Sequence, residues 1–284
     1  MPNKNIWLIC KYATPHKYFF GTRHFSLSKN WVKLGYKVHI FTSNSSHLTN
    51  SLPKFKKWYF TEYIDGIKTT WINLLSSKKS NGINRIISWI LFEFKLLLFK
   101  KDQESRPNII IVSSLSLLSI WSGIFFSWKY NSKFILEIRD IWPKSLLVLG
   151  KYSKYNPFVL FLSLTERLGY KFADKIIGTM PNLVEHVKNI NHKYASKVIC
   201  IPQCYDEDFY DNKQINISND YKKRLDNNNF KICYIGTLNI NNPIETLLLS
   251  SINQNFDVII IGKGSQINFL KKKYFKFRNI IFLP

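Results

Sequence analysis

The sequence contains few of the residues that mark several protein classes. Its 284 residues include 4 cysteines, 11 glycines and 10 prolines. This excludes a collagen-like or low-complexity chain. The four cysteines lack the paired spacing of a zinc site, so we expect free thiols in a reducing compartment, with a metal site as the minor alternative. They are Cys10, Cys200, Cys204 and Cys233.

Acidic residues are also scarce, and the imbalance is greatest at the start of the chain. Lys and Arg total 41 against 18 Asp and Glu, a net charge of +23. Residues 1–101 hold 17 of the basic and 3 of the acidic side chains. Such a basic segment predicts an anionic partner: membrane headgroups, nucleic acid or phosphorylated ligands. No nucleic-acid-binding motif is present, so we expect no nucleic acid, although a charge-driven nucleic-acid-binding protein stays an alternative.

Long hydrophobic runs and a secretory signal are absent from the sequence. The two most apolar stretches are residues 83–99 and 115–128. The first contains charged residues and the second is shorter than the roughly 20 residues that span a bilayer. We expect both to be buried core helices, with a helix lying in the membrane interface as the alternative for the first.

Several catalytic signatures are missing as well. The sequence has no Gly-x-Ser-x-Gly elbow, no His-Glu-x-x-His, no P-loop and no kinase signature set. Its six histidines show no metal-binding spacing. We therefore expect no metal ion and no bound cofactor.

Short apolar runs alternate with helical patterns along most of the chain, at 45% hydrophobic and 16% aromatic residues. This rhythm predicts an α/β fold with doubly wound parallel sheets. Predicted strands are 6–10, 37–42, 67–73, 108–113, 133–138, 175–178, 197–201, 231–235, 257–261 and 279–283. Predicted helices are 22–34, 83–100, 115–130, 157–172, 183–189, 244–253 and 266–274.

The polar stretch 203–229 interrupts this rhythm and is rich in Asp, Asn and Lys. We interpret it as a linker between two Rossmann-like domains, residues 1–202 and 230–284. The second domain has only three predicted strands, which favours a truncated chain over a small module completed by a partner.

Ligands of open parallel sheets bind at the carboxyl ends of the strands, so the loops that follow strands carry the candidate site. The first such loop leads through Gly21 into a helix beginning near Thr22. Free N–H groups there would favour an anion, and Arg23 and His24 could add donors. A plain turn into the helix, with Thr22 as N-cap, is the alternative.

A second candidate segment brings Glu137, Arg139 and Asp140 to the end of a buried strand. Charges in such a place have a desolvation cost unless they are paired or used. One interpretation is a polar substrate site. The other is a structural Glu137–Arg139 pair, with Asp140 capping the next helix.

In the second domain, glycines follow the first two strands. Gly236 and Thr237 come after the first, and Gly262 and Gly264 after the next. Glycines allow a ligand to approach the backbone, although turns alone would also explain them.

Taken together, these loops resemble the family 4 glycosyltransferases of the GT-B fold, and within them the fucosaminyltransferase-like group of bacterial O-antigen and capsule clusters. The most specific match is Glu137–Pro143, which is similar to a Glu-Val-Arg-Asp-Leu-Trp-Pro segment. Residues 21–43 are similar to that group's first loop, helix and second strand. Residues 173–181 are similar to its Ala-Asp strand, and residues 201–206 to its Ile-Pro-Asn-Gly-Val-Asp hinge.

The resemblance implies two Rossmann-like domains, the second incomplete. It also implies retaining transfer of a sugar from a nucleotide-sugar, UDP-linked, to a lipid-linked saccharide. Asp140 and Arg139 would be catalytic, facing the acceptor or the transferred sugar. Gly21, Arg23, His24 and Glu137 would form the acceptor and phosphate loop. The donor would bind along Gly236, Thr237, Gly262 and Gly264. The basic domain would dock on anionic membrane, so the location that the resemblance implies is cytoplasmic, peripheral on the inner face of the cell membrane.

The sequence also departs from this family. The Glu-x7-Glu segment that holds the donor is absent, and the resemblance implies roughly a hundred further residues. The alternative function is therefore a catalytically inactive remnant, or a partner subunit that binds membrane or another transferase.

Overall fold

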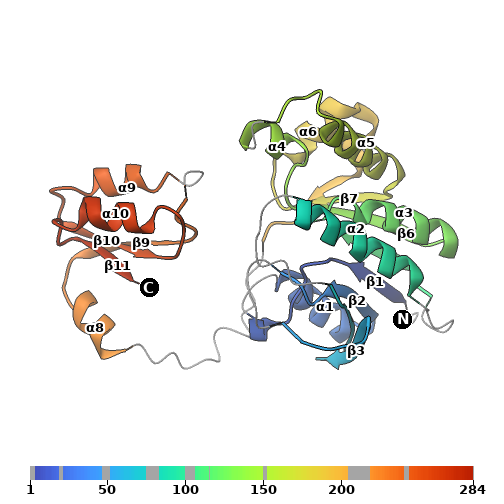
Figure 1. The fold of residues 1–284 in the computed structure, drawn as a ribbon, viewed down its shortest axis with the longest axis horizontal. Helices are drawn as coiled ribbons and strands as arrows, with labels where there is room; N and C mark the ends of the chain where they lie inside the picture. Colours follow the sequence, from blue (N-terminus) through green and yellow to red (C-terminus); the bar gives the residue numbers. More distant parts are fainter. Residues whose placement is uncertain are drawn as a thin grey trace. The chain divides into compact units, whose positions relative to one another are not determined.

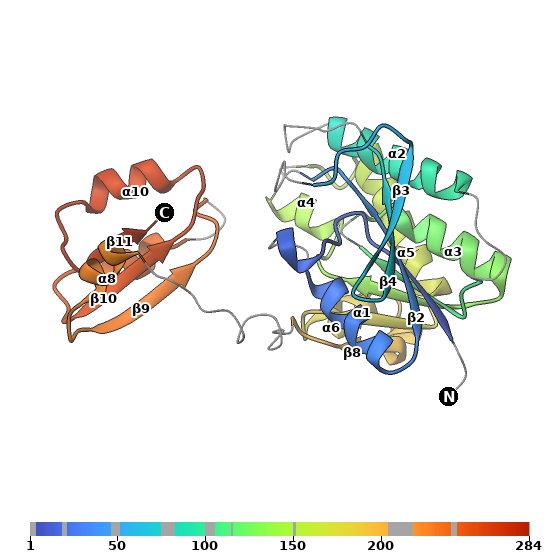
Figure 2. The same cartoon turned by 90° about the horizontal axis from the view of Figure 1, so that it is seen from below.

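Two units of parallel sheet make up the chain, residues Met1–Asp211 and Asn212–Pro284 (Figures 1 and 2). A computed structural model describes residues 4–18, 22–46, 52–74, 83–99, 106–114, 116–149, 152–203, 218–239 and 243–283. The predicted linker, residues 203–229, contains one described helix, α8 (Asn219–Leu225).

The first unit is built on an eight-stranded sheet in the order β3-β4-β2-β1-β5-β6-β7-β8. The strands are β1 (Asn5–Ile9), β2 (Lys37–Ser43), β3 (Tyr59–Ile64), β4 (Ile67–Ile72), β5 (Ile109–Ser113), β6 (Lys133–Ile138), β7 (Lys175–Gly178) and β8 (Val198–Cys200). The helices are η1 (His16–Tyr18), α1 (Arg23–Lys33), α2 (Ile83–Leu98), α3 (Ser119–Tyr130), α4 (Lys144–Leu149), α5 (Pro157–Phe172), α6 (Leu183–Ile190) and η3 (His192–Lys197).

The direction in which successive strands are added to this sheet reverses between β1 and β5. β2 and β4 lie on one side of β1, and β5 to β8 follow on the other, all in parallel pairs. The carboxyl ends of β1 and β5 therefore form a topological switch point, where open α/β sheets bind their ligands. Every strand predicted for this unit is present, with bounds shifted by one residue or less.

The sequence prediction missed one strand, β3. It pairs antiparallel with β4 at the sheet edge and is mostly half-buried or exposed. Asp65 and Gly66 form the turn between them, both with positive φ angles. An Asp-Gly pair in this conformation is typical of a tight β-hairpin.

Successive residues of β1 pack into different cores. Trp7 and Ile9 join a core that includes side chains of α2, α3, α5 and α6. Ile6 and Leu8 join a second core with Phe25 of α1. This alternation places the two groups on opposite faces of the sheet. Figures 1 and 2 show α2, α3 and α5 as one layer.

The two most apolar predicted helices contribute to the first of these cores, so the expectation of buried core helices is confirmed for one side of each; the opposite side of each helix exposes apolar side chains. Trp89, Phe92 and Leu96 of α2 are buried there, and so are Ile120 and Phe126 of α3. No helix within the described residues is long and apolar enough to cross a membrane. The helix α3 begins at Ser119, later than predicted, and α4 was not predicted.

The second unit holds a parallel sheet in the order β11-β10-β9. Its strands are β9 (Phe230–Ile235), β10 (Phe256–Ile261) and β11 (Ile280–Leu283), and its helices are α8, α9 (Glu245–Ser250) and α10 (Ile267–Tyr274). One core lies beneath α9 and α10, and a smaller one includes Tyr221 and Leu225 of α8. The predicted strands are all present, with bounds shifted by one residue or less.

Candidate functional site

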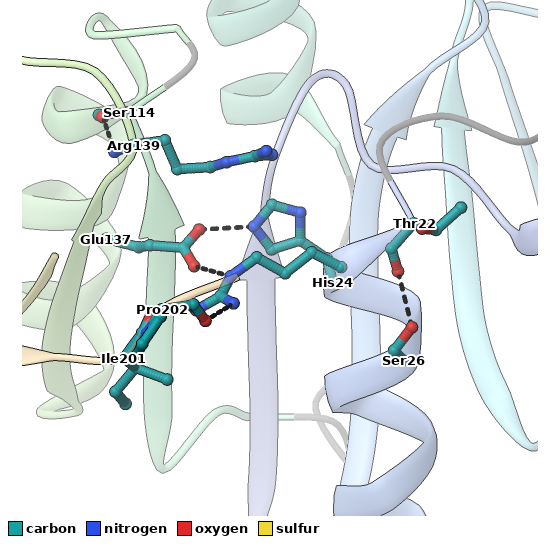
Figure 3. A network of polar contacts seen from close by, with 9 residues as sticks. Thr22, His24, Ser26, Ser114, Glu137, Arg139, Ile201 and Pro202 are labelled. Carbon is teal, nitrogen blue, oxygen red and sulfur yellow. Dashed lines mark hydrogen bonds and ion pairs between the residues drawn. The ribbon is translucent and has the colours of Figure 1, made fainter. Parts of the chain in front are cut away.

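A buried carboxylate, Glu137, lies at the centre of the candidate site (Figure 3). It is the penultimate residue of β6 and faces the first two residues of α1. Arg23 Nε donates to Glu137 Oε1 at 2.9 Å, and His24 Nε2 lies 2.6 Å from Oε2. All three side chains are at most 4% exposed. The fold thus places three sequence-predicted site residues in one network.

Arg23 makes further contacts from the same guanidinium group. Nη1 donates to the carbonyl of Pro202 at 2.6 Å, and Nη2 donates to that of Ile201 at 2.9 Å. These carbonyls follow β8, on a segment 178 residues from Arg23 in the chain. Arg23 therefore ties the start of α1 to the end of β6 and to the segment after β8.

The electrostatics of the network favour charged side chains. Burial alone would lower the pKa of His24, but the neighbouring Cys10 and Glu137 outweigh it and raise the pKa to about 10. Burial would raise the pKa of Glu137, yet His24 and the hydrogen bond from Arg23 hold it well below its usual range. At neutral pH the network is an imidazolium and a guanidinium sharing one carboxylate.

Cys10 is a member of this site that the sequence analysis did not select. It directly follows β1, at the switch point, and is fully buried. Burial would raise the pKa of its thiol, but the adjacent His24 imidazolium and the more distant Arg139 lower it. Its position at the end of the first predicted strand was the signal that could have identified it.

Arg139 and Asp140 lie at the accessible border of the network. Arg139 is half-buried, its backbone N–H donates to Ser114 Oγ at 3.2 Å, and Figure 3 shows its side chain extending toward the α1 side. Asp140 is exposed, and within the described residues no hydrogen bond to its carboxylate is found. Glu137 pairs with α1, so the alternative of a Glu137–Arg139 pair is wrong. Asp140 does not cap a helix either, because α4 begins only at Lys144.

Gly21, predicted at the phosphate loop, lies outside the described residues. Thr22 directly precedes α1 and its side chain makes no capping hydrogen bond. Its backbone is already helical, and its carbonyl accepts from Ser26 (Figure 3). The prediction that the Thr22 side chain caps this helix was therefore wrong.

In the second unit, two of the four predicted donor residues line a pocket. Its volume is about 560 Å³, and Gly236, Thr237, Pro243, Ile244 and Leu247 are among its walls. Pockets of this size accommodate small-molecule ligands. Gly236 and Thr237 directly follow β9, at the carboxyl end of the strand.

Gly262 and Gly264 serve a different purpose, close packing of two loops. A Cβ atom on Gly262 would lie 1.9 Å from the carbonyl oxygen of Gly236, and one on Gly264 would lie 2.0 Å from that of Leu238. Only glycine allows the loops after β9 and β10 to approach this closely. These two glycines shape the loop that carries Gly236 and Thr237.

A second pair of buried titratable side chains lies in the first unit: Lys11, two residues after β1, and Glu93 on α2. Burial and Arg85 lower the pKa of Lys11 to about 7, and burial raises that of Glu93 to about 7. The hydroxyls of Ser119 and Ser122 donate to the Glu93 carboxylate. Glu93, the single acidic residue of the apolar stretch 83–99, was the sequence signal for this pair. Among the described residues, no group of side chains could hold a metal ion.

Comparison with known proteins places this geometry in a known fold. No family model and no curated protein matches the sequence. Solved structures do match. Anabaena HepE in complex with UDP-glucose is 14% identical with a TM-score of 0.57, over 98% of this chain and 68% of HepE. The fold is of the GT-B type.

Two further structures are similar over 99% of this chain. A Glycyrrhiza uralensis protein, UGT73P12, complexed with glycyrrhetinic acid 3-O-monoglucuronide, is 9% identical with a TM-score of 0.53 over 69% of its length. A UDP-N-acetylglucosamine 2-epimerase is 10% identical with a TM-score of 0.54 over 68% of its length. At these identities the likeness establishes the fold.

Proposed function

We propose that this protein transfers a sugar from a UDP-linked donor to a lipid-linked saccharide, as a retaining family 4 glycosyltransferase of the fucosaminyltransferase-like group. The observation that carries the proposal is the Arg23–Glu137–His24 network at the end of β6. A buried charged network fixes the backbone there, and Arg139 and Asp140 follow it directly on the accessible side. Preorganised polar groups of this kind are what group transfer requires.

The second unit supports the donor half of the proposal. Its pocket lies at the carboxyl end of β9, and Gly236 and Thr237 are among the residues that line it. Glycine loops in this position let a diphosphate approach backbone N–H groups. HepE, which shares the fold, was crystallised with UDP-glucose, which makes a UDP-sugar the first donor to test.

In the proposed reaction an acceptor hydroxyl oxygen bonds to the anomeric carbon while the bond from that carbon to the diphosphate oxygen breaks. The hydroxyl proton leaves to a base. Asp140 is the proposed positioning or proton-accepting group, because its carboxylate is exposed. Arg139 would stabilise developing negative charge beside it. No protein nucleophile is assigned.

The charge of the chain supports the proposed acceptor and location. The first 101 residues carry 17 basic and 3 acidic side chains. A lipid-linked, pyrophosphate-bearing acceptor in an anionic membrane matches this imbalance. We therefore propose a peripheral protein on the cytoplasmic face, acting in surface polysaccharide synthesis.

The test is transfer by the full chain, measured as UDP release from a panel of UDP-sugars with a lipid-linked saccharide. Asp140→Ala is expected to lower turnover about 100-fold or more without changing the unfolding midpoint. Glu185→Ala, an exposed carboxylate on α6, is the matched control and should retain turnover. Unchanged turnover in Asp140→Ala would refute the assigned role.

Other outcomes identify the alternatives. UDP-sugar binding with no transfer to any acceptor, together with co-purification of a second transferase, would favour the inactive partner subunit. Conversion of the UDP-sugar to its epimer without an acceptor would indicate an epimerase instead.

A further inference from the structure

The outer side of the helix layer of the first unit is apolar. On α2, Trp89, Phe92 and Leu96 point inward and are buried. On the opposite side, Ile90 is 53% and Phe94 58% exposed, and Ile87, Leu97 and Leu98 are exposed too. Spacings of three and four residues place these side chains on one stripe of the helix. The helix α2 is thus apolar on the side away from the core as well.

The neighbouring helices continue this surface. Trp128 of α3 is 83% exposed, and Trp121 and Phe125 lie on the same side of that helix. On α5 the exposed residues include Leu160, Phe161 and Leu164.

Hydrogen bonds hold the three helices together as one layer. Trp121 Nε1 of α3 donates to Thr165 Oγ1 of α5, and Ser119 and Ser122 of α3 bond Glu93 of α2. We call the exposed side chains of α2, α3 and α5 the helix face. A contiguous surface with this many large apolar groups is rare on a protein that stays free in water.

The charges on the helix face have one sign. The acidic residues of the three helices, Glu93 and Glu166, are both buried, at 8% and 4% exposure. The exposed charged residues are Lys129, Arg167 and Lys171. Two copies of such a face would repel each other, whereas anionic headgroups would be attracted to it.

We propose that the helix face is a docking surface for a bilayer that contains anionic phospholipids. The helices would lie on the bilayer, with Phe94 and Trp128 among the side chains at the boundary of headgroups and acyl chains. The cationic side chains would reach the phosphates, as in interfacial amphipathic helices. This inference rests on the membrane-bound acceptor proposed above, but the docking itself needs neither donor nor turnover.

The test is cosedimentation of the full chain with phosphatidylcholine vesicles that contain or lack phosphatidylglycerol. The face variant carries Phe94→Ser, Trp128→Ser and Leu164→Ser, one change per helix. The matched control carries Leu34→Ser, Tyr63→Ser and Phe275→Ser, which remove side chains of similar or greater exposure elsewhere (60%, 73% and 73%). Circular dichroism and the unfolding midpoint establish that all three proteins fold.

We expect the wild type and the control to bind the anionic vesicles within twofold of each other. The face variant should bind these vesicles at least about tenfold more weakly. At high salt, residual binding should persist in the wild type and be lost in the face variant, because apolar insertion is not screened.

Equal binding by the face variant and the control would overturn the proposal and assign vesicle binding to the general positive charge. The surface would instead be assigned to self-association if the wild type did not bind the vesicles and the face variant formed a smaller oligomer than the wild type. Sugar transfer to a soluble acceptor analogue by the face variant would show that the proposed function stands when docking fails.

Discussion

Replacing Glu137 with glutamine removes the one negative charge that Arg23 and His24 share. The guanidinium and the imidazole would then stay buried against a neutral amide. Breaking a buried ion pair on one side costs about 3–5 kcal/mol, because the remaining charge keeps its desolvation penalty. The loss should appear in the stability of the first unit.

Tryptophan fluorescence reports this unit selectively. All 8 tryptophans of the sequence precede Pro143, within the first unit. If the free energy of unfolding falls by roughly 2 kcal/mol per molar urea, a loss of this size lowers the midpoint of urea unfolding by about 2 M. The exposed Glu185→Gln is the control, and its midpoint should stay within about 0.3 M of the wild type.

The pH dependence separates this explanation from a simple packing defect. The pKa of His24 is raised to about 10 in the folded protein, from 6.5. The stabilisation is fully present below pH 6.5 and is lost as the pH rises toward 10. Glu137, with a lowered pKa, contributes above its unfolded pKa of about 4.3 and loses that contribution as the pH falls.

The difference between wild type and Glu137→Gln should therefore be largest near pH 5–7 and shrink toward pH 10. A midpoint shift below 0.5 M urea at pH 7, or a difference constant from pH 6 to 10, would contradict the assignment of a charged His24–Glu137 pair.

Two further predictions concern the second unit and the thiols. Gly262→Ala places a Cβ atom against the Gly236 carbonyl, so it should destabilise the second unit by about 1–3 kcal/mol and leave the tryptophan-detected transition unchanged. Hydrogen exchange of residues 230–283 measures this loss. Unaltered protection of these residues would contradict the packing role. Cys200 and Cys233 are exposed and should react with a thiol reagent in the native protein, whereas Cys10 should react only on unfolding, as mass spectrometry of the labelled peptides can show. Native labelling of Cys10 would refute its burial.

Elements with a strong local pattern were predictable, and those set by long-range pairing were not. The buried parallel strands were found because each is a short run of β-branched residues. The strand β3 was missed because an edge strand needs only partial burial, so Tyr59–Ile64 lacks a clear pattern. The Asp65-Gly66 pair was visible in the sequence and would have identified the hairpin.

The sequence predicted which residues belong to the candidate site, but it did not predict which of them pair with each other. Glu137, Arg23 and His24 were selected because they lie beside strand ends, yet the partner of Glu137 is 114 residues away in Arg23. A local interpretation suggested Arg139, which is two residues away and directly follows β6. The actual partner is set by the fold, because Glu137, the start of α1 and residues 201–202 meet only when the whole sheet has formed.

Burial divides the site residues by what they are able to do. Arg23 and His24 are 2% and 1% exposed and already engaged by Glu137, so they can act on a substrate only through the geometry they impose. Arg139 and Asp140 retain access to solvent. Because β6 carries Glu137 two residues before Arg139, any shift of the network moves the accessible pair with it. Substitutions in the network should thus alter turnover even when the substrate touches only Arg139 and Asp140.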